Sequence, residues 1–267
     1  MSFATNTKSI FHIIHPNNNF KMNLAALKLF FRDERQFRIF MIMCLSTVFN
    51  IMLVLYRTFR IDFDWSIITN FQDFKANRGL DGTCFFLIWN LFLAWVPYWI
   101  ALTLTLFTRI KANPSVFSIT FLLSTWLLFF PNAPYLVTDL LHLKETHVVP
   151  HWYDVMLFSS FAWTGMMLGY CSLFEIQHYL EQMFQKWFVW VLMISAIWLG
   201  GFGVYMGRFQ RWNSWDIVNH PFALIKQQIH VLSNPLEYLG TLGVAFVLSA
   251  FMMIGYLTLN ALRATSN

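Results

Sequence analysis

The chain has 267 residues, of which 57% are hydrophobic, 19% are aromatic and only 12% are charged. A soluble domain is nearer half apolar and a quarter charged, so this composition excludes an ordinary soluble fold and indicates an integral membrane protein. The formal net charge of +5 comes from basic residues scattered over the predicted loops. This distribution favours membrane topology and headgroup contact, and we expect no nucleic-acid partner.

Six stretches are apolar and long enough to cross a bilayer, for which about 20 residues are needed. In chain order they are Phe37–Tyr56, Cys84–Phe107, Pro114–Phe130, Asp154–Phe174, Phe188–Met206 and Tyr238–Leu262. The sequence therefore predicts an all-α polytopic transmembrane bundle of about six spans, with a proline-broken third span and short interfacial helices on the outer face.

The domain organisation follows from these spans. Residues 1–36 are predicted to be a cytoplasmic N-terminal tail, partly disordered because its beginning is polar and rich in asparagine, without a signal-peptide cleavage pattern. Residues 37–262 are predicted to be a single transmembrane domain, and residues 263–267 a C-terminal tail.

Basic residues set the expected orientation. Lys28, Arg32, Arg35 and Arg38 crowd the N-terminal end of the first span, and such clusters stay in the cytoplasm. An even number of spans places both termini on that same side. Three long loops are then expected outside, and they are residues 57–83, 131–153 and 207–237.

The segment after the third span combines two prolines with polar side chains. Pro131 and Pro134 each remove a backbone donor, so they are expected to end the span, with a second helix starting at Pro134. One face of that helix is polar while leucines fill the other. The polar face consists of Tyr135, Thr138, Asp139 and His142. Ionisable groups beside hydrocarbon are expensive, which makes this face a functional-site hypothesis.

A metal site is one interpretation of this region. Asp139 and His142 are three residues apart, and so are His151 and Asp154 at the mouth of the fourth span. Imidazole and carboxylate are ordinary ligands of zinc and similar divalent ions, the only cofactor that the sequence suggests, although this spacing matches no established zinc motif. The alternative is that Asp154 caps the fourth helix, His151 lies on the surface, and Asp139 and His142 pair with each other or with arginines.

Two arginines leave the outer end of the fifth span. Arg208 and Arg211 are three residues apart, and their planar guanidinium groups suit a lipid phosphate or diphosphate headgroup. The alternative is an ion-pair network with Asp139, Asp154 and Asp216 that only holds the loops.

Three further features of the spans carry expectations about packing and hydrogen bonding. Asn90 lies inside the second span, where its amide needs partners, and the backbone groups freed at residues 131–135 are the expected ones. The spacings Gly165-x-x-x-Gly169 and Gly203-x-x-x-Gly207 predict close helix packing. At the other end of the fourth span, a solvated face is expected of Glu175, His178 and Glu181.

Four motifs make the chain similar to a known family. They are Phe130–Leu143, Gly207–Asp216, Trp152-Tyr153-Asp154 and Trp89-Asn90-Leu91. Together they resemble the bacterial membrane family catalogued as domain of unknown function 1361, over roughly residues 85–260. The resemblance implies a multi-pass protein of the bacterial cytoplasmic (inner) membrane, and it implies no activity.

We expect the polar residues to converge in one outward-facing pocket. The predicted catalytic residues are Asp139, His142 and Asp154. The predicted substrate-binding residues are Arg208, Arg211, Asn213, Asp216, Asn90, Asn132 and Tyr135.

Three functions are compatible with such a pocket. The first is an intramembrane enzyme acting on an envelope lipid or lipid-linked phosphate, with His142 or Asp139 as the acid/base and the arginines stabilising phosphate charge. The second is a non-catalytic scaffold whose loops bind an envelope protein. The third, a small-solute transporter, ranks lower, because below Asn90 the spans offer only scattered hydroxyls for a polar path.

Overall fold

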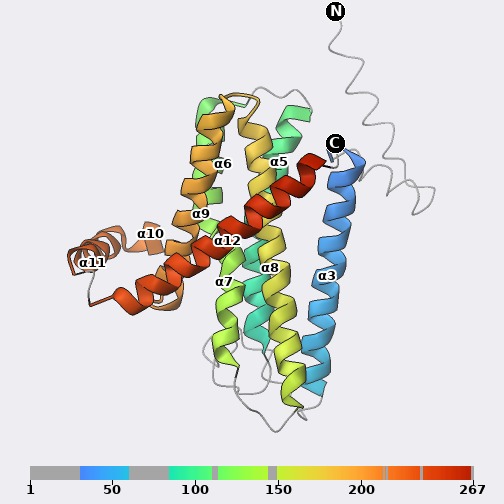
Figure 1. The fold of residues 1–267 in the computed structure, drawn as a ribbon, viewed down its shortest axis with the longest axis vertical. Helices are drawn as coiled ribbons and strands as arrows, with labels where there is room; N and C mark the ends of the chain where they lie inside the picture. The colour runs from blue at the N-terminus through green and yellow to red at the C-terminus, as the bar shows by residue number, and fades with distance from the viewer. Residues whose placement is uncertain are drawn as a thin grey trace, which may run out of the picture.

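The computed structural model describes residues 31–59, 84–109, 114–143, 149–212, 214, 216–234 and 237–265. Within these ranges the chain forms helices and no strand. Six of the helical segments are long and apolar enough to cross a membrane, which confirms the predicted all-α polytopic class (Figure 1). Most of the predicted N-terminal tail, residues 1–30, lies outside the described residues.

The elements follow the predicted order with somewhat different limits. They are α3 (Glu34–Phe59), α5 (Phe85–Arg109), α6 (Val116–Phe129), α7 (Asn132–Thr138), the 3₁₀ turn η2 (Asp139–His142), α8 (His151–Leu180), α9 (Lys186–Arg208), α10 (Asp216–Asn219), α11 (Pro221–Ser233) and α12 (Leu239–Thr265).

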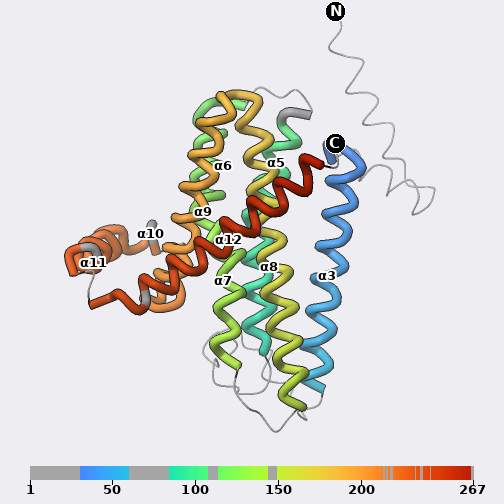
Figure 2. The backbone as a smooth tube through the Cα atoms, in the orientation of Figure 1, coloured from blue at the N-terminus to red at the C-terminus, as the bar shows by residue number. Residues whose placement is uncertain are grey.

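Helix α8 is the centre of the bundle. It is the most buried span, and it packs against α5, α7 and α3. Figure 1 shows α3 and α8 running side by side, while α12 crosses the bundle obliquely and packs on α9. The tube in Figure 2 shows α11 projecting sideways near the end of α9. The start of α3 and the end of α12 meet at one end of the bundle, which we call the Glu175 end; η2 and the end of α9 lie toward the other, the Asp139 end.

Helix α3 begins earlier than predicted because a polar cap precedes its apolar run. The Gln36 backbone N–H donates to Asp33 Oδ1 at 2.7 Å, and the Arg32 N–H donates to Gln36 Oε1 at 2.6 Å. The Asp33 carboxylate thus satisfies a donor that the first turn of the helix leaves free, and the Gln36 side chain in return holds the backbone just before the cap, as in a capping box. The helix therefore starts at Glu34 rather than at Phe37.

The third span is longer than predicted, because the two prolines interrupt its hydrogen bonds without ending it. Residues 116–142 form a single candidate crossing of 27 residues. Phe130 and Pro131 keep right-handed helical backbone angles, and Ala133 N–H donates to Phe130 O at 3.1 Å. Two carbonyls just before the break accept hydrogen bonds from side chains: Asn132 Nδ2 donates to Phe129 O at 2.9 Å, and Ser214 Oγ donates to Leu128 O at 3.2 Å. Asp139 and His142 consequently belong to the span and not to a loop.

The buried face of α3 repeats every seven residues, as in a coiled-coil seam, and it is unusually polar. The repeat consists of Gln36, Met43, Asn50 and Arg57. Asn50 Nδ2 donates to Thr164 Oγ1 of α8 at 2.7 Å, and the Ser46 hydroxyl contacts the same oxygen at 2.6 Å. Inside a bilayer, such hydrogen bonds determine which helix α3 packs against and in which register. Apolar side chains cannot do so, because contact with lipid is as favourable for them as contact with another helix.

Candidate functional site

Asp139 is the centre of a cluster that joins three parts of the chain. Its carboxylate is 1% exposed and accepts hydrogen bonds from Asn90 Nδ2 of α5, at 2.9 Å, and from Arg208 Nη2 at the end of α9. Arg208 thereby forms an ion pair with Asp139. The predicted meeting of these two charges is confirmed, and Asn90 contacts Asp139 instead of the backbone near the prolines.

The Arg208 guanidinium is held on all sides. Its Nε donates to Thr138 Oγ1 at 2.9 Å, its Nη1 lies 2.6 Å from His142 Nε2, and its Cζ lies 4.3 Å from the centre of the Tyr135 ring. Because a guanidinium only donates, His142 Nε2 must accept, which assigns a neutral imidazole with its proton on Nδ1. We call Asn90, Tyr135, Thr138, Asp139, His142 and Arg208 the Asp139 cluster.

Small residues set the position of α7, and with it the cluster. A Cβ added to Gly165 of α8 would lie 2.5 Å from Ala133 O, and one added to Gly203 of α9 would lie 2.4 Å from Pro131 Cγ. The α7 backbone can approach α8, and the Pro131 ring before α7 can approach α9, only because these positions lack side chains, as the glycine spacing predicted. The contacts fix α7 between α8 and α9, so that η2 reaches the Arg208 side chain.

Burial divides the cluster into a fixed part and an accessible part. The Arg208 side chain is 11% exposed and Asp139 almost fully enclosed, whereas His142 lies at the surface beside the Phe86 ring, 5.7 Å between centroids. A carboxylate that already accepts from an amide and a guanidinium serves to orient the arginine. The accessible chemistry is therefore an imidazole in contact with a permanent positive charge.

Asp154 does not belong to this cluster. Its two carboxylate oxygens accept from Arg57 Nε at 2.7 Å and from Arg57 Nη2 at 3.1 Å, and both side chains are 3% exposed. His151 lies exposed at the first position of α8. Among the described residues, no three His, Cys, Asp or Glu side chains gather as metal ligands do. The four residues of the predicted metal site, Asp139, His142, His151 and Asp154, are not gathered in this structure, and each of the two carboxylates pairs with an arginine.

The other predicted site residues are spread over the segment that follows α9. Asn132 Nδ2 contacts Ser214 Oγ at 3.3 Å, so it ties the start of α7 to this segment and does not face Asp139. Arg211 is exposed and has a left-handed backbone with φ of 60°. Asp216 begins α10, and Asn213 lies outside the described residues.

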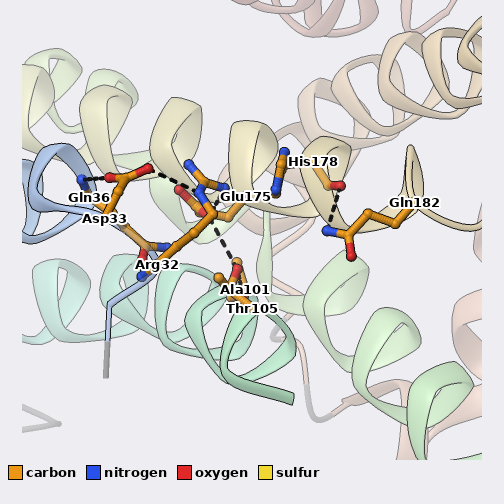
Figure 3. A network of polar contacts seen from close by, with 8 residues as sticks. All are labelled: Arg32, Asp33, Gln36, Ala101, Thr105, Glu175, His178 and Gln182. Atoms are coloured by element: carbon orange, nitrogen blue, oxygen red, sulfur yellow. Dashed lines mark hydrogen bonds and ion pairs between the residues drawn. The ribbon is translucent and has the colours of Figure 1, made fainter. Parts of the chain in front are cut away.

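The opposite end holds a buried carboxylate that the sequence interpretation missed. Glu175 is 8% exposed, which corrects the prediction of a solvated face there. Figure 3 shows it between Thr105 of α5, whose Oγ1 donates at 3.1 Å, and Arg32, whose Nη1 lies at 3.4 Å. The seven-residue polar repeat of α3 was the available signal, since Gln36 and Arg57 start and end a seam that contacts α8 near Glu175 and at Asp154.

Comparison with known proteins assigns the family. No curated protein and no solved structure matched the chain. The model of a family described as "Protein of unknown function (DUF1361)" matches residues 89–254, which include the whole Asp139 cluster and exclude α3. Since that match covers more than half of the sequence, the chain is a multi-pass membrane protein that belongs to the DUF1361 family.

Proposed function

We propose that the protein is a membrane enzyme that binds the phosphate of an anionic or polyprenyl-linked lipid at the Asp139 cluster, with His142 as its acid/base. The single observation that supports this is the Arg208–His142 contact. A guanidinium is held rigidly by a buried carboxylate and touches a surface imidazole at 2.6 Å. A permanent cation adjacent to a neutral imidazole combines charge stabilisation with proton transfer in one place.

The chemistry in this proposal is hydrolysis of a phosphate ester. A phosphate oxygen takes the Arg208 Nη1 donor that now contacts His142, which frees Nε2. His142 then accepts a proton from water as the water oxygen bonds to phosphorus, and returns it to the departing ester oxygen as that bond breaks. Arg208 stabilises the charge that develops on the phosphate oxygens, and Asp139 keeps Arg208 in place.

The proposed site faces away from the cytoplasm of a bacterial inner membrane. The positive-inside rule supports this orientation, because Arg32, Arg35 and Arg38 crowd the start of α3 at the Glu175 end. Among the described residues that end also carries Lys186 and Arg263, while Arg57, Arg208, Arg211 and Lys226 lie at the other end without such a cluster. The lipid phosphate is then met in the outer leaflet.

The test uses the full chain in nanodiscs with phosphatidic acid, phosphatidylglycerol or a polyprenyl phosphate as separate substrates. We expect hydrolysis of one of them, which releases inorganic phosphate from phosphatidic acid or the polyprenyl phosphate, or glycerol or glycerol phosphate from phosphatidylglycerol. In His142→Gln we expect retained lipid binding but a loss of about a hundredfold or more in rate, and in Arg208→Lys weakened binding. His151→Gln is the matched control, because it removes an exposed histidine from the same end. Equal behaviour of the two histidine variants, or indifference to all three lipids, contradicts the proposal.

A transporter is the second candidate, and the α3–α8 seam is the observation that favours it. Buried polar groups of α8 have partners at three levels: Asp154 pairs with Arg57, Thr164 with Asn50, and Glu175 with Arg32, which precedes α3. Intramembrane ionisable residues often mark a transport path. Proton flux into vesicles that is lost in Glu175→Gln and kept in His142→Gln supports transport over the enzyme.

A further inference from the structure

Helix α11 is amphipathic, but its polar face points toward the protein and its apolar face points outward, the reverse of a helix packed on a soluble protein. Its inward face holds amides: Gln227 Oε1 accepts from Trp212 Nε1 at 2.8 Å, and Gln228 Nε2 donates to Gln210 Oε1 at 2.6 Å. Val231 is the apolar contact that anchors the helix, buried beside Tyr205 of α9 and Ala245 of α12.

The outward face of α11 is apolar. Phe222 is 86% exposed, Ile225 53% and Ile229 59%. At 100° per residue these three side chains fall within about 60° of one another, so they form one stripe along the helix. Lys226 and His230 are exposed along one flank of that stripe. An exposed apolar stripe with a basic flank is the pattern of a helix that lies in the plane of a membrane interface.

The position of α11 along the chain indicates that lipid covers the apolar stripe. Gln210 and Trp212, which hold α11, come directly after α9 ends at Arg208, and the last apolar span begins at Leu242. Because α11 connects the end of one crossing to the start of the next, it lies at the membrane border. Phe209, directly after α9, and Leu239, shortly before the last span, are also exposed apolar side chains.

We propose that α11 inserts Phe222, Ile225 and Ile229 among the acyl chains of the leaflet at the Asp139 end, while Lys226 contacts anionic headgroup phosphates. The occupant of the stripe is the lipid monolayer itself. This inference stands independently of the proposed enzyme. It also places lipid phosphates at the level of Arg211, next to Trp212, which donates to Gln227 of α11, and this is where a lipid substrate would arrive.

The test places a fluorescent nitrobenzoxadiazole label on Ile229→Cys in the full chain, with Cys44, Cys84 and Cys171 changed to alanine, in phosphatidylcholine vesicles. We expect quenching by doxyl-labelled lipid chains and protection from aqueous iodide. The matched control is a label on Ala223→Cys, which is exposed but lies off the stripe, and which iodide should quench more strongly. Both positions are at the surface, so neither label has to be accommodated in the core.

Two results overturn the insertion. Quenching of the Ile229 label by iodide means that the stripe faces water. Protection from both quenchers means that protein covers it, either a second copy or a partner.

The headgroup contact has its own measurement. Replacing the doxyl phosphatidylcholine by doxyl phosphatidylglycerol should increase quenching at Ile229→Cys, and Lys226→Gln should reduce that preference by up to about fivefold. Lys226→Arg keeps the charge and should keep the preference. A preference that survives in Lys226→Gln overturns the anionic contact.

Discussion

The two ends of the bundle each bury a carboxylate against an arginine, and they do so with different rigidity. Asp139 is enclosed, and its partner Arg208 is 11% exposed and also held by Thr138, His142 and the Tyr135 ring. Glu175 has a looser partner, because Arg32 is 30% exposed, lies at 3.4 Å and shares its charge with Asp33 at 3.1 Å. The first pair fixes a geometry, whereas the second joins the start of α3 to the bundle.

This difference follows from where the partners come from. Arg208 is the last residue of a membrane span and α7 is wedged beside it by glycine contacts, so the guanidinium has little freedom. Arg32 precedes α3 and keeps water as a competing partner. A buried pair gains from electrostatic attraction only when its geometry is fixed and its remaining donors are satisfied. The Asp139 end meets that condition and the Glu175 end meets it in part.

The largest expected effect is at the enclosed pair. Asp139→Asn leaves the Arg208 charge buried without its counter-ion, and breaking such a pair costs about 3–5 kcal/mol of unfolding free energy. Unfolding in mixed detergent micelles measures this loss. Glu175→Gln is the matched comparison, expected to cost about 1 kcal/mol, because it retains the Thr105 hydrogen bond and Arg32 can turn to water. Equal losses in the two variants would remove the distinction between the ends.

The next largest effect is expected from the helix packing that positions α7 at the Asp139 end. Gly165→Val places a side chain against Ala133 O, which a Cβ would already approach to 2.5 Å, so α7 must move away from α8. Overpacking of this kind costs about 1–3 kcal/mol. Gly243→Val is the control, since nothing lies within 4 Å of its Cβ position. Thermal unfolding should shift in the first variant alone, and an unchanged transition would show that α7 is not wedged.

A smaller effect, of opposite sign, is expected just after Arg208. Arg211 has a φ of 60°, which costs a side-chain-bearing residue roughly 1–2 kcal/mol relative to glycine. Arg211→Gly should therefore stabilise the protein by up to about that amount, while weakening binding of lipid phosphate if the arginine contributes to it. Arg211→Ala removes the charge but retains the strain, so its melting temperature should not rise. A rise in both variants would show that backbone strain is not the cause.

The smallest effect is a pH dependence at the start of α3. Burial raises the pKa of Asp33, but hydrogen bonds from the Gln36 N–H and from Arg32 lower it more, so its pKa lies below the ordinary value of 3.8. A depressed pKa means that the cap contributes fully above about pH 4 and is lost as the pH falls through the folded-state value. Asp33→Asn can still cap the helix, so it should remove this acid dependence at little cost at neutral pH. Hydrogen exchange of the first turn of α3 reports the change, and an acid dependence that persists in the variant would assign it elsewhere.

The sequence alone predicted most of the architecture and part of the candidate site. Apolar run length predicted all six crossings, and the polar face of residues 135–142 indicated Asp139 and His142. It failed where a partner comes from far along the chain. Asp154 could not be separated from Asp139 by spacing, because its pairing with Arg57 depends on how α3 lies on α8. Glu175 looked like a surface residue, because a single helix does not reveal which of its faces a distant segment covers.

The amino-acid sequence determined what hydrophobicity and local backbone preference decide: six crossings and a polar stripe beside two prolines. These features depend on residues a few positions apart and on the thickness of the membrane, so no tertiary contact is needed to predict them. Only the tertiary structure decided which carboxylate pairs with which arginine. It also decided that the two prolines interrupt the backbone hydrogen bonds of the third span without ending it. Those outcomes depend on glycine contacts and side-chain donors from other helices, because inside a bilayer every buried polar group takes its partner from whichever segment packing brings within reach.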